Sequence, residues 1–362
     1  MPGRQREDRL GGGVSVRVGW DLGGAHVKAA LCRDGVIEKV WQLPCPLWRG
    51  LEWIDRAVAT VAGSLPACDH GITMTGEMAD IFPHREAGVR ALLARFATQV
   101  RGDVYVFADT GFIPLSGLDD SIDHRQIASQ NWQLPARWLS RHLDDALYLD
   151  IGSTTTDIAV ISDRRLVIRG RDDHRRLRSG ELLYFGVVRT PLMALAREVP
   201  FQGHCIPLMA EHFATTADVY RILGHLSPDK DQAETADGGD RSVEASMRRL
   251  ARMVGLDLED APTSVWRHLA RSFHEILMQR LTLACLRHGQ GVESLVGAGV
   301  GRFLVPELAR RLDLSWRDFG DFVTEVPGVR FTAADCAPAA ALALMLDRYL
   351  RDDKMNSSQS GR

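Results

Sequence analysis

Runs of apolar residues alternate along the first half of the chain with segments in which apolar residues recur every three or four positions. The short runs predict β-strands, and the longer periodic segments predict helices. The predicted strands are Val14–Trp20, Ala25–Arg33, Val36–Leu43, Gly71–Thr75 and Val104–Ala108. The predicted helices are Leu51–Leu65, Glu86–Val100 and Ile127–Leu143, with Asn131 and Trp132 on the last. This order, βββαβαβα, is enough to form one domain.

The same order returns in the second half, with insertions. The predicted strands are Leu147–Ile151, Asp157–Ile168 (a strand and a hairpin), Ser294–Val296 and Asp321–Val326, and the predicted helices are Ser242–Val254, Ser264–His288, Phe303–Leu312 and Ala333–Leu350. We therefore expect one domain over residues 14–145 and a second over residues 146–351, with an irregular insertion at about 171–235 that folds over a cleft. Residues 1–13 and 352–362 are predicted to be flexible tails.

The two halves are most alike at a glycine turn between the first two strands of each. Val14–Leu31 reads VSVRVGWDLGGAHVKAAL, and Leu147–Ile161 reads LYLDIGSTTTDIAVI, so that Asp21 or Asp150 closes a strand just before the turn. Backbone N–H groups in such a turn form an anion site, and a strand-end carboxylate suits a hydrated Mg²⁺. One copy alone is equally compatible with a plain hairpin. Two copies indicate an internal duplication and favour a phosphate clamp that also holds a metal.

Composition narrows the class of protein. A chain of 362 residues with 45% hydrophobic content can bury a large core and suggests about two domains. The net charge of −3, with no extended basic block outside Arg164–Arg178, gives no sign of a nucleic-acid partner. Six cysteines without a CxxC pair fit a reducing compartment rather than a disulfide framework or zinc site. With a polar N-terminus and no run of about 18 apolar residues, we expect a cytoplasmic protein without a membrane partner. A homodimer is left open.

The element order, the paired turns and a late glycine turn at Gly297–Gly301 together resemble the actin/hexokinase/Hsp70-type ATPase superfamily. Its domains are ribonuclease H-like, so the resemblance implies an α/β fold of two duplicated βββαβαβα domains around an interdomain cleft. Longer blocks, among them TMTGEMADIFPHREAGV, ASQNW and SGELLYFGVVRTP, are similar to the hydantoinase/oxoprolinase branch. Within that branch they resemble the small single-chain members linked to tetrahydromethanopterin-dependent C1 transfer and methanofuran biosynthesis. The resemblance spans about residues 14–350.

The resemblance to these small members implies a reaction that the residues alone do not reveal. It implies that the phenol of γ-glutamyltyramine is joined to a furanylmethyl diphosphate, with release of diphosphate and formation of an aryl alkyl ether. The residues themselves predict only a Mg²⁺-bound polyphosphate between two domains. Mg²⁺ is the expected cofactor, and ATP is possible but not favoured.

The predicted phosphate site combines both turns. Its residues are Asp21, Gly23, Gly24, His26, Asp150, Gly152, Ser153, Thr154, Thr155 and Asp157. Asp21 and Asp150 are the predicted Mg²⁺ ligands, directly or through water, and Asp157 alternatively orients the hydroxyl groups of the second turn. Lys28 is predicted to be a catalytic cation for the phosphate, with a strand-edge lysine as the alternative. His26 is predicted to contact phosphate, with an exposed loop histidine equally compatible.

The remaining predicted site residues are candidates for removing the phenol proton or for covering a substrate ring. Glu77 is the first choice for the general base and Asp80 the second, because a carboxylate at a strand end suits that role; the alternative is a pair of acids at a helix N-terminus. Asn131 and Trp132 are predicted to cover a substrate ring, although a tryptophan on an amphipathic helix is more often part of the core.

Two further segments have open interpretations. Gly297, Gly299 and Gly301 belong to a turn that holds adenosine in the superfamily and is here predicted to hold the furan or its aminomethyl group. Close approach of a helix to a strand also selects glycine. The basic stretch Arg171–Arg178 is compatible with binding of the γ-glutamyl carboxylate and, slightly better, with a solvated surface.

Three functions compete at this point. The first is the diphosphate-displacing transferase, which needs no ATP. The second is an ATP-dependent small-molecule kinase or a cyclic-amide hydrolase of the hydantoinase/oxoprolinase type, which converts ATP to ADP. The third is a nucleotide-sensing protein that binds ATP without turnover.

Overall fold

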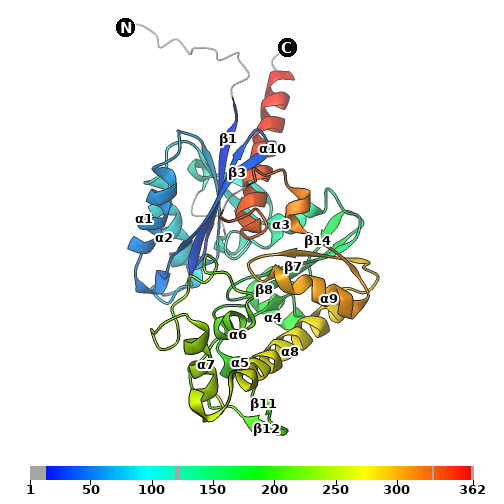
Figure 1. Cartoon of the computed structure of the whole chain (residues 1–362). Helices are drawn as coiled ribbons and strands as arrows, with labels where there is room; N and C mark the ends of the chain where they lie inside the picture. Colours follow the sequence, from blue (N-terminus) through cyan, green and yellow to red (C-terminus); the bar gives the residue numbers. More distant parts are fainter. Residues whose placement is uncertain (1–13, 119–122, 328–329, 360–362) are drawn as a thin grey trace.

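The computed structural model describes residues 14–118, 123–327 and 330–359, with side chains described as far as residue 353. The chain forms two lobes, each built around a mixed β-sheet (Figure 1). The N-terminal tail predicted for residues 1–13 lies outside the described residues. No helix in the described part of the chain combines the length and apolar character needed to cross a bilayer.

The first sheet has the strand order β3-β2-β1-β4-β5-β6. Its strands are β1 (Val16–Leu22), β2 (His26–Arg33), β3 (Val36–Pro44), β4 (Asp69–Met74), β5 (Val104–Ala108) and β6 (Gly111–Pro114). Strands β1 to β3 are antiparallel, whereas β4 and β5 run parallel to β1. Helices α1 (Glu52–Ala62) and α2 (Arg85–Ala97) share a hydrophobic core with one face of this sheet.

The second sheet repeats this arrangement, with the order β10-β8-β7-β13-β14 and β9 also paired to β8. Its strands are β7 (Ala146–Ile151), β8 (Thr156–Ser162), β9 (Arg165–Val167), β10 (Leu182–Leu183), β13 (Ser294–Ala298) and β14 (Ser315–Asp318). Strands β7 to β9 are antiparallel, and β13 and β14 run parallel to β7. The predicted duplicated α/β fold is confirmed, because the strands β2-β1-β4-β5 of the first sheet and β8-β7-β13-β14 of the second have the same order and directions.

Two helices lie between the sheets and join the lobes. Helices α3 (Gln133–Leu139) and α10 (Ala337–Gln359) share one hydrophobic core with residues of both sheets. A Cβ atom on Gly19 of β1 would lie 2.2 Å from the carbonyl oxygen of Ala339, so only glycine allows α10 to approach this closely. The alanines of α10 serve the same close contact. The last helix therefore packs on the first sheet, although its residues follow the second in sequence.

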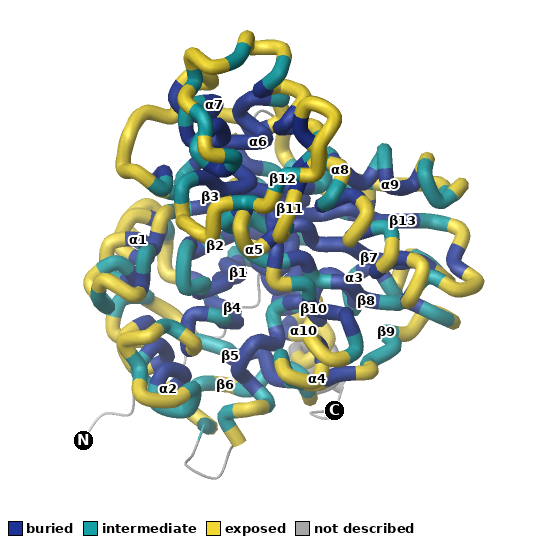
Figure 2. The backbone as a smooth tube through the Cα atoms, turned by 90° about the horizontal axis from the view of Figure 1, so that it is seen from below, coloured by how far each residue is buried: buried dark blue, intermediate teal, exposed yellow. Residues whose placement is uncertain are grey.

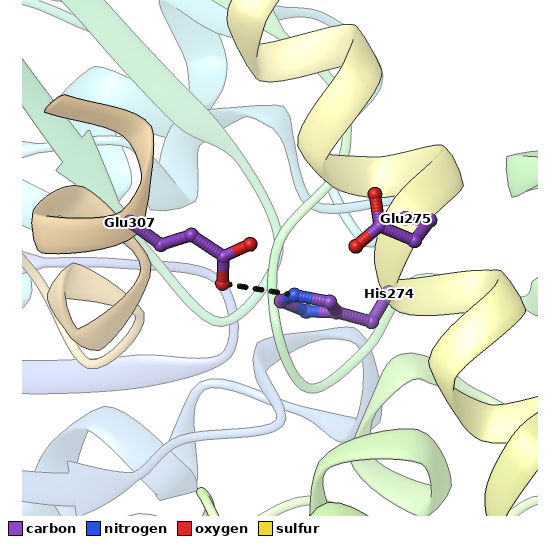
Figure 3. Close-up of side chains that lie close together, drawn as sticks. All are labelled: His274, Glu275 and Glu307. Carbon is purple, nitrogen blue, oxygen red and sulfur yellow. Dashed lines mark hydrogen bonds and ion pairs between the residues drawn. The ribbon is translucent and has the colours of Figure 1, made fainter. Parts of the chain in front are cut away.

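The outer face of the second sheet is covered by one long helix and one short helix. Helices α8 (Thr263–His288) and α9 (Val305–Leu312) share a core with that sheet. Figure 2 shows the buried central strands of both sheets in dark blue and exposed loops around α7 (Val243–Arg252). A hydrogen bond of 3.2 Å between His274 Nε2 on α8 and Glu307 Oε2 on α9 ties these two helices together (Figure 3).

The segment 171–235, predicted to be irregular, instead contains several short helices and strands joined by loops. They are α4 (Asp173–Ser179), α5 (Leu192–Leu195), β11 (Glu198–Phe201), β12 (His204–Pro207) and α6 (Thr216–Leu223), in addition to β10. The prediction failed because buried ion pairs give this segment a polar sequence. Arg221, for example, is 2.8 Å from Asp218 and 2.6 Å from Asp231, and all three side chains are buried.

Three further predictions of elements are wrong. The helix predicted for Ile127–Leu143 is only α3, because Ser129 has a left-handed backbone (φ 54°) that interrupts any helix there. The strand predicted for Asp321–Val326 is replaced by β14 and a 3-10 helix, whose first turn is capped by Asp318. The tail predicted from residue 352 is helical as far as Gln359. The 3-10 helices are Leu47–Arg49, Gly76–Met78, Leu115–Gly117, His124–Gln126, Leu258–Asp260, Arg302–Leu304 and Phe319–Phe322.

Candidate active site

A cleft of about 380 Å³ lies between the lobes, and both glycine turns line it. From the first lobe come the turn after β1, Lys28, Trp48 and the segment after β4, together with Ser129 and Asn131. From the second lobe come Asp150, the turn after β7, Asp157 and residues of the segment 171–235. The structure thus brings the two duplicated turns into one shared crevice.

The duplication places four ionisable side chains in equivalent pairs. In the first sheet Asp21 lies opposite Lys28, and in the second Asp150 lies opposite Asp157. Lys28 therefore stands where the other copy has Asp157. All four residues line the cleft, so three carboxylates face one lysine across the pseudo-symmetric centre. Asp21 and Asp150 occupy equivalent positions in the two sheets, so each lobe contributes one of these two carboxylates to the cleft.

Burial and mutual charge shift the pKa values of this group. Burial raises the pKa of Asp21, and it raises the pKa of Asp150 to about 6, while Lys28 acts in the opposite direction on both. Burial lowers the pKa of Lys28, but Asp150 and Asp21 outweigh it and leave that pKa raised. Among the described residues, the Lys28 ammonium makes no hydrogen bond and no ion pair within 4 Å. Lys28 is therefore a charged group whose hydrogen-bonding capacity is available to a ligand.

Both turns are closed by the same backbone hydrogen bond. The N–H of Gly23 donates to the carbonyl of His26 at 3.0 Å, and that of Gly152 donates to the carbonyl of Thr155 at 2.9 Å. In the part of the chain that the structure describes, no acceptor is found for the N–H groups of Ser153, Thr154 and Thr155, or of Gly24 and Ala25. Unengaged N–H groups in a turn are the donors that a phosphate needs.

The second turn is fixed from behind by the segment that follows β10. The N–H groups of Val187 and Val188 donate to the carbonyls of Gly152 and Ser153, both at 3.1 Å. Gly186 packs so closely on this turn that a Cβ atom would lie 2.4 Å from the carbonyl oxygen of Gly152. The carbonyls of the turn are thereby held away from an incoming anion, since they are engaged on the far side.

Arg189 is a cleft residue that sequence reasoning missed. Its guanidinium lies over the Trp48 ring at 4.8 Å and makes one long hydrogen bond, of 3.4 Å, to the Thr154 hydroxyl. Trp48 belongs to the first lobe and Arg189 to the second, so this contact spans the mouth of the cleft. The available signal was weak: Arg189 stands within the block SGELLYFGVVRTP, where nothing marks it as facing Thr154, 35 positions earlier.

His26 and Arg176 line the cleft with different charge states. Burial lowers the pKa of His26 to about 3, and Lys28 and Arg189 act in the same direction, so the imidazole is neutral and offers one N–H donor. Arg176 is buried, lies 2.7 Å from Asp157, and stacks over the Trp132 ring at 4.0 Å. Asp157 thus already has a partner, whereas Asp21 and Asp150 have none of opposite charge within 4 Å among the described residues.

The two predicted general bases occupy different positions. Asp80 is exposed and lines the cleft. Glu77 is 1% exposed and does not line it; its Oε1 accepts a hydrogen bond of 2.7 Å from Ser129, which does. The expectation that Glu77 faces the cleft directly is wrong, because the 3-10 helix Gly76–Met78 turns its side chain behind the cleft wall.

The predicted ring-binding residues are also divided. Asn131 lines the cleft and donates to Asp21 at 3.4 Å. Trp132 is 2% exposed and belongs to the core between the lobes, as the alternative held. Of the Arg171–Arg178 stretch, Arg176 reaches the cleft and Arg171, Arg175 and Arg178 are exposed.

The late glycine turn supports the site from behind. None of Gly297, Gly299 and Gly301 lines the cleft. A Cβ atom on Gly297 would lie 2.8 Å from Val305, and one on Gly301 would lie 2.5 Å from Ile151. Gly299 has φ 81°, and its Cβ would lie 2.4 Å from Asp150 Oδ1. These glycines are explained by close approach of the chain to α9 and to β7, which favours the packing interpretation.

Outside the cleft, His274, Glu275 and Glu307 form a group of potential metal ligands whose atoms lie within 4.8 Å of one another (Figure 3). Arg311 pairs with both glutamates, at 2.7 Å from Glu275 and a shorter distance from Glu307. Both carboxylates already have the same arginine as a partner, so the group is explained as an ion-pair cluster of Arg311 with Glu275 and Glu307 between α8 and α9.

The chain is similar to one protein-family model and to two named proteins. A model of the family "Hydantoinase/oxoprolinase" matches residues 126–337. The (4-{4-[2-(γ-L-glutamylamino)ethyl]phenoxymethyl}furan-2-yl)methanamine synthase of Methanocaldococcus jannaschii is 29% identical over 243 residues, which are 67% of this chain and 72% of that protein. The synthase of the same name from Methanococcus vannielii is 27% identical over 183 residues, 50% of this chain and 82% of that protein.

Solved structures are more distant. The activator of the 2-hydroxyisocaproyl-CoA dehydratase from Clostridium difficile is 10% identical, with a TM-score of 0.46 and coverage of 94% of this chain and 97% of that one. An acetone carboxylase structure is 13% identical, with a TM-score of 0.48 and coverage of 91% and 70%. At these TM-scores the similarities do not bear on function. The family model, in contrast, covers more than half of the chain, and the chain belongs to the hydantoinase/oxoprolinase family.

Proposed function

We propose that this chain is a transferase that joins the phenol of γ-glutamyltyramine to a furanylmethyl diphosphate and releases diphosphate. The product would be the aryl alkyl ether after which the two synthase relatives are named. In this proposal the enzyme acts in methanofuran-type biosynthesis, which serves tetrahydromethanopterin-linked C1 metabolism. The observation that carries the proposal is the shared cleft, in which two turns with unengaged N–H groups flank Asp21, Asp150 and Lys28.

The residues of the cleft fit a magnesium ion. Asp21 and Asp150 offer oxygen donors from opposite lobes, and oxygen is the ligand that Mg²⁺ prefers. Neither carboxylate has a cationic partner within 4 Å among the described residues, and burial makes their charge costly. A divalent cation held by these two side chains, directly or through water, would neutralise the charge of a bound diphosphate.

The chain's own groups then account for the departure of diphosphate. The bond between the furanylmethyl carbon and the diphosphate oxygen breaks, its electron pair leaves with diphosphate, and the phenol oxygen forms the new C–O bond. Negative charge grows on the leaving oxygen. Lys28, Arg189 and the free N–H groups of both turns are fixed donors for that charge, and such preorganised donors are worth about 10²- to 10³-fold each in rate.

The pH dependence of magnesium binding follows from Asp150. Its raised pKa of about 6 means that its contribution to folding stability is complete below about pH 4 and is lost as the pH rises through about 6. A bound cation offsets the unfavourable free energy of keeping the buried Asp150 carboxylate charged. We therefore expect Mg²⁺ to raise the melting temperature clearly at pH 7.5 and little at pH 5, as measured by thermal unfolding. Asp150→Asn should abolish the difference. An equal effect of Mg²⁺ at both pH values would contradict the assignment of Asp150 as a ligand.

Two exposed aromatic residues at the cleft are suited to the substrate rings. Trp48 of the first lobe is 43% exposed and Tyr184 of the second is 63% exposed, and both line the cleft. A lost aromatic contact costs about 0.5–1.5 kcal/mol, so Trp48→Ala should raise KM for one substrate by about 3- to 10-fold. Trp48→Phe, which keeps a ring, should stay within about 2-fold. Steady-state kinetics with each substrate varied in turn check this, and an unchanged KM for both substrates would show that neither ring contacts Trp48.

One assay separates the candidate functions. Purified protein is incubated with Mg²⁺, furanylmethyl diphosphate and γ-glutamyltyramine, and separately with the same mixture plus ATP. We expect ether and diphosphate in equal amounts without ATP, detected by mass spectrometry and a diphosphate assay. A product that appears only with ATP, accompanied by ADP, would overturn the proposal in favour of an ATP-dependent kinase or hydrolase. Binding of ATP without any product would favour a nucleotide sensor.

A further inference from the structure

Three side chains from separate parts of the chain meet at one hydroxyl group beside the cleft. Ser129 Oγ lies 2.7 Å from Glu77 Oε1 and 3.1 Å from Asp173 Oδ2. Glu77 comes from the 3-10 helix after β4, Ser129 precedes α3, and Asp173 is the first residue of α4. Ser129 and Asp173 line the cleft, whereas Glu77 is buried behind Ser129.

The hydroxyl group of Ser129 carries a single proton but has a carboxylate on each side. It can donate to only one of them at a time. Contact with the other is favourable only when that carboxyl group is protonated and donates to Ser129 Oγ. The other oxygen of Glu77, Oε2, is buried and has no hydrogen-bond partner among the described residues. Ser129 can therefore form hydrogen bonds with both Glu77 and Asp173 only when one of the two carboxyl groups is protonated, and either group can carry that proton.

The charged surroundings distinguish the two carboxyl groups. Arg85 from α2 lies 2.7 Å from Asp173 Oδ2, so the group at the cleft wall has a fixed cation beside it. Burial raises the pKa of Glu77; its hydrogen bond from Ser129 and the charge of Arg85 act against that, and Asp173 adds to it. Glu77 is thus a buried group with an increased affinity for a proton, and Asp173 is the group that a substrate can reach.

Ser129 is held in its bridging position by an uncommon backbone conformation. Its φ of 54° lies in the left-handed region, which is rarely adopted by residues other than glycine, asparagine and aspartate. Such conformations persist where the surrounding structure enforces them, and they are concentrated at functional sites. In this structure the conformation places the hydroxyl between groups from both lobes.

We propose that Asp173, Ser129 and Glu77 form a proton relay that removes the phenolic proton during ether formation. This proposal rests on the proposed function above. As the phenol oxygen bonds to the furanylmethyl carbon, its O–H bond breaks and the proton passes to Asp173. Asp173 then gives a proton to Ser129 Oγ while the Ser129 proton moves to Glu77 Oε1. The electron pair of the broken C–O bond leaves with diphosphate. After product release the proton returns along the same path to water in the cleft.

A phenol that has already lost its proton tests the relay separately from folding and from substrate positioning. The variants are Glu77→Gln, Asp173→Asn and Ser129→Gly, the last chosen because glycine tolerates the positive φ. Glu86→Gln is the matched control, because Glu86 is a half-exposed residue of α2 that pairs with Arg90 on the surface. Each is assayed with γ-glutamyltyramine and with a ring-fluorinated analogue whose phenol is ionised at the assay pH.

With γ-glutamyltyramine we expect kcat to fall about 10²-fold in the three relay variants and to stay unchanged in Glu86→Gln. With the ionised analogue the relay variants should come within about 5-fold of the unmodified enzyme, because proton removal is no longer needed. The kcat of the unmodified enzyme with γ-glutamyltyramine should also rise with pH along an acidic limb that Glu77→Gln lacks.

If the relay variants lost the same factor in kcat with both phenols, the relay would be overturned and the three side chains would be only a structural contact between the lobes. Full activity of the variants with both phenols would also overturn it. Melting temperatures identify any variant that fails to fold; Asp173→Asn, at the cleft surface, then decides the outcome. If the unmodified enzyme makes no ether from either phenol, the proposed function fails and the relay with it. If it makes ether but the variants do not distinguish the two phenols, only the relay fails.

Discussion

Replacing Asp150 by asparagine is expected to lower kcat/KM for ether formation by about 10³-fold, which corresponds to about 4 kcal/mol of lost transition-state stabilisation. Asp150 is buried at the end of β7, and its charged form has no cationic partner within 4 Å among the described residues. Asparagine keeps the size of the side chain but cannot neutralise a divalent cation. The loss should appear in steady-state kinetics at saturating Mg²⁺, because the remaining donor set would no longer hold the ion in position.

The control for Asp150 is Asp144→Asn, since Asp144 is an exposed residue of the same lobe that pairs only with Arg164 among described side chains. It should keep the activity of the unmodified protein. Asp21→Asn should behave like Asp150→Asn, because the duplication gives the two aspartates equivalent positions at the ends of β1 and β7. If either variant kept more than about a tenth of the activity, that carboxylate would not be a metal ligand.

Replacing Lys28 by methionine is expected to lower kcat/KM by about 10²- to 10³-fold. Lys28 stands at a cleft position where the two copies have opposite charges, since the equivalent residue is Asp157. Without it, Asp21, Asp150 and Asp157 would face an anionic substrate with no lysine among them. Much of the loss should therefore appear as a higher KM for the diphosphate substrate, measured by initial rates.

Lys28→Arg keeps the positive charge and should recover at least about a tenth of the activity, although the larger guanidinium does not replace an ammonium without rearrangement. A Lys28→Met variant with a normal KM for the diphosphate would contradict the role of Lys28. The positive charge of Lys28 lowers the pKa of Asp21 and of Asp150. Loss of the lysine should therefore raise the pKa of both carboxyl groups further.

The sequence was sufficient to predict the parts of the site that lie close together along the chain. Asp21, Gly23 and Lys28 fall within one hairpin, as do Asp150, Gly152 and Asp157, so strand periodicity and glycine position were enough to predict their local arrangement. The duplication of that hairpin also predicted the two sheets, because the remaining strands and helices follow in the same order.

The contributions of distant segments could not be predicted in this way. Trp48 and Arg189 meet across the mouth of the cleft, and Ser129 meets Glu77 and Asp173, yet no periodic pattern links these positions. The left-handed backbone of Ser129 also prevents the predicted helix from beginning at Ile127, and of the two predicted ring-binding residues only Asn131 lines the cleft. Gly299 illustrates the opposite error: its spacing resembled a ligand site, but it supports Asp150 from behind.

A crystal structure of the protein with Mg²⁺ and diphosphate tests the central claim most directly. The account predicts one diphosphate between the turns at Gly23–Gly24 and Gly152–Thr155, with the cation on the Asp21 and Asp150 carboxylates and the Lys28 ammonium in contact with a phosphate oxygen. Diphosphate bound by only one of the two turns, or at any place outside the cleft between the lobes, would contradict it.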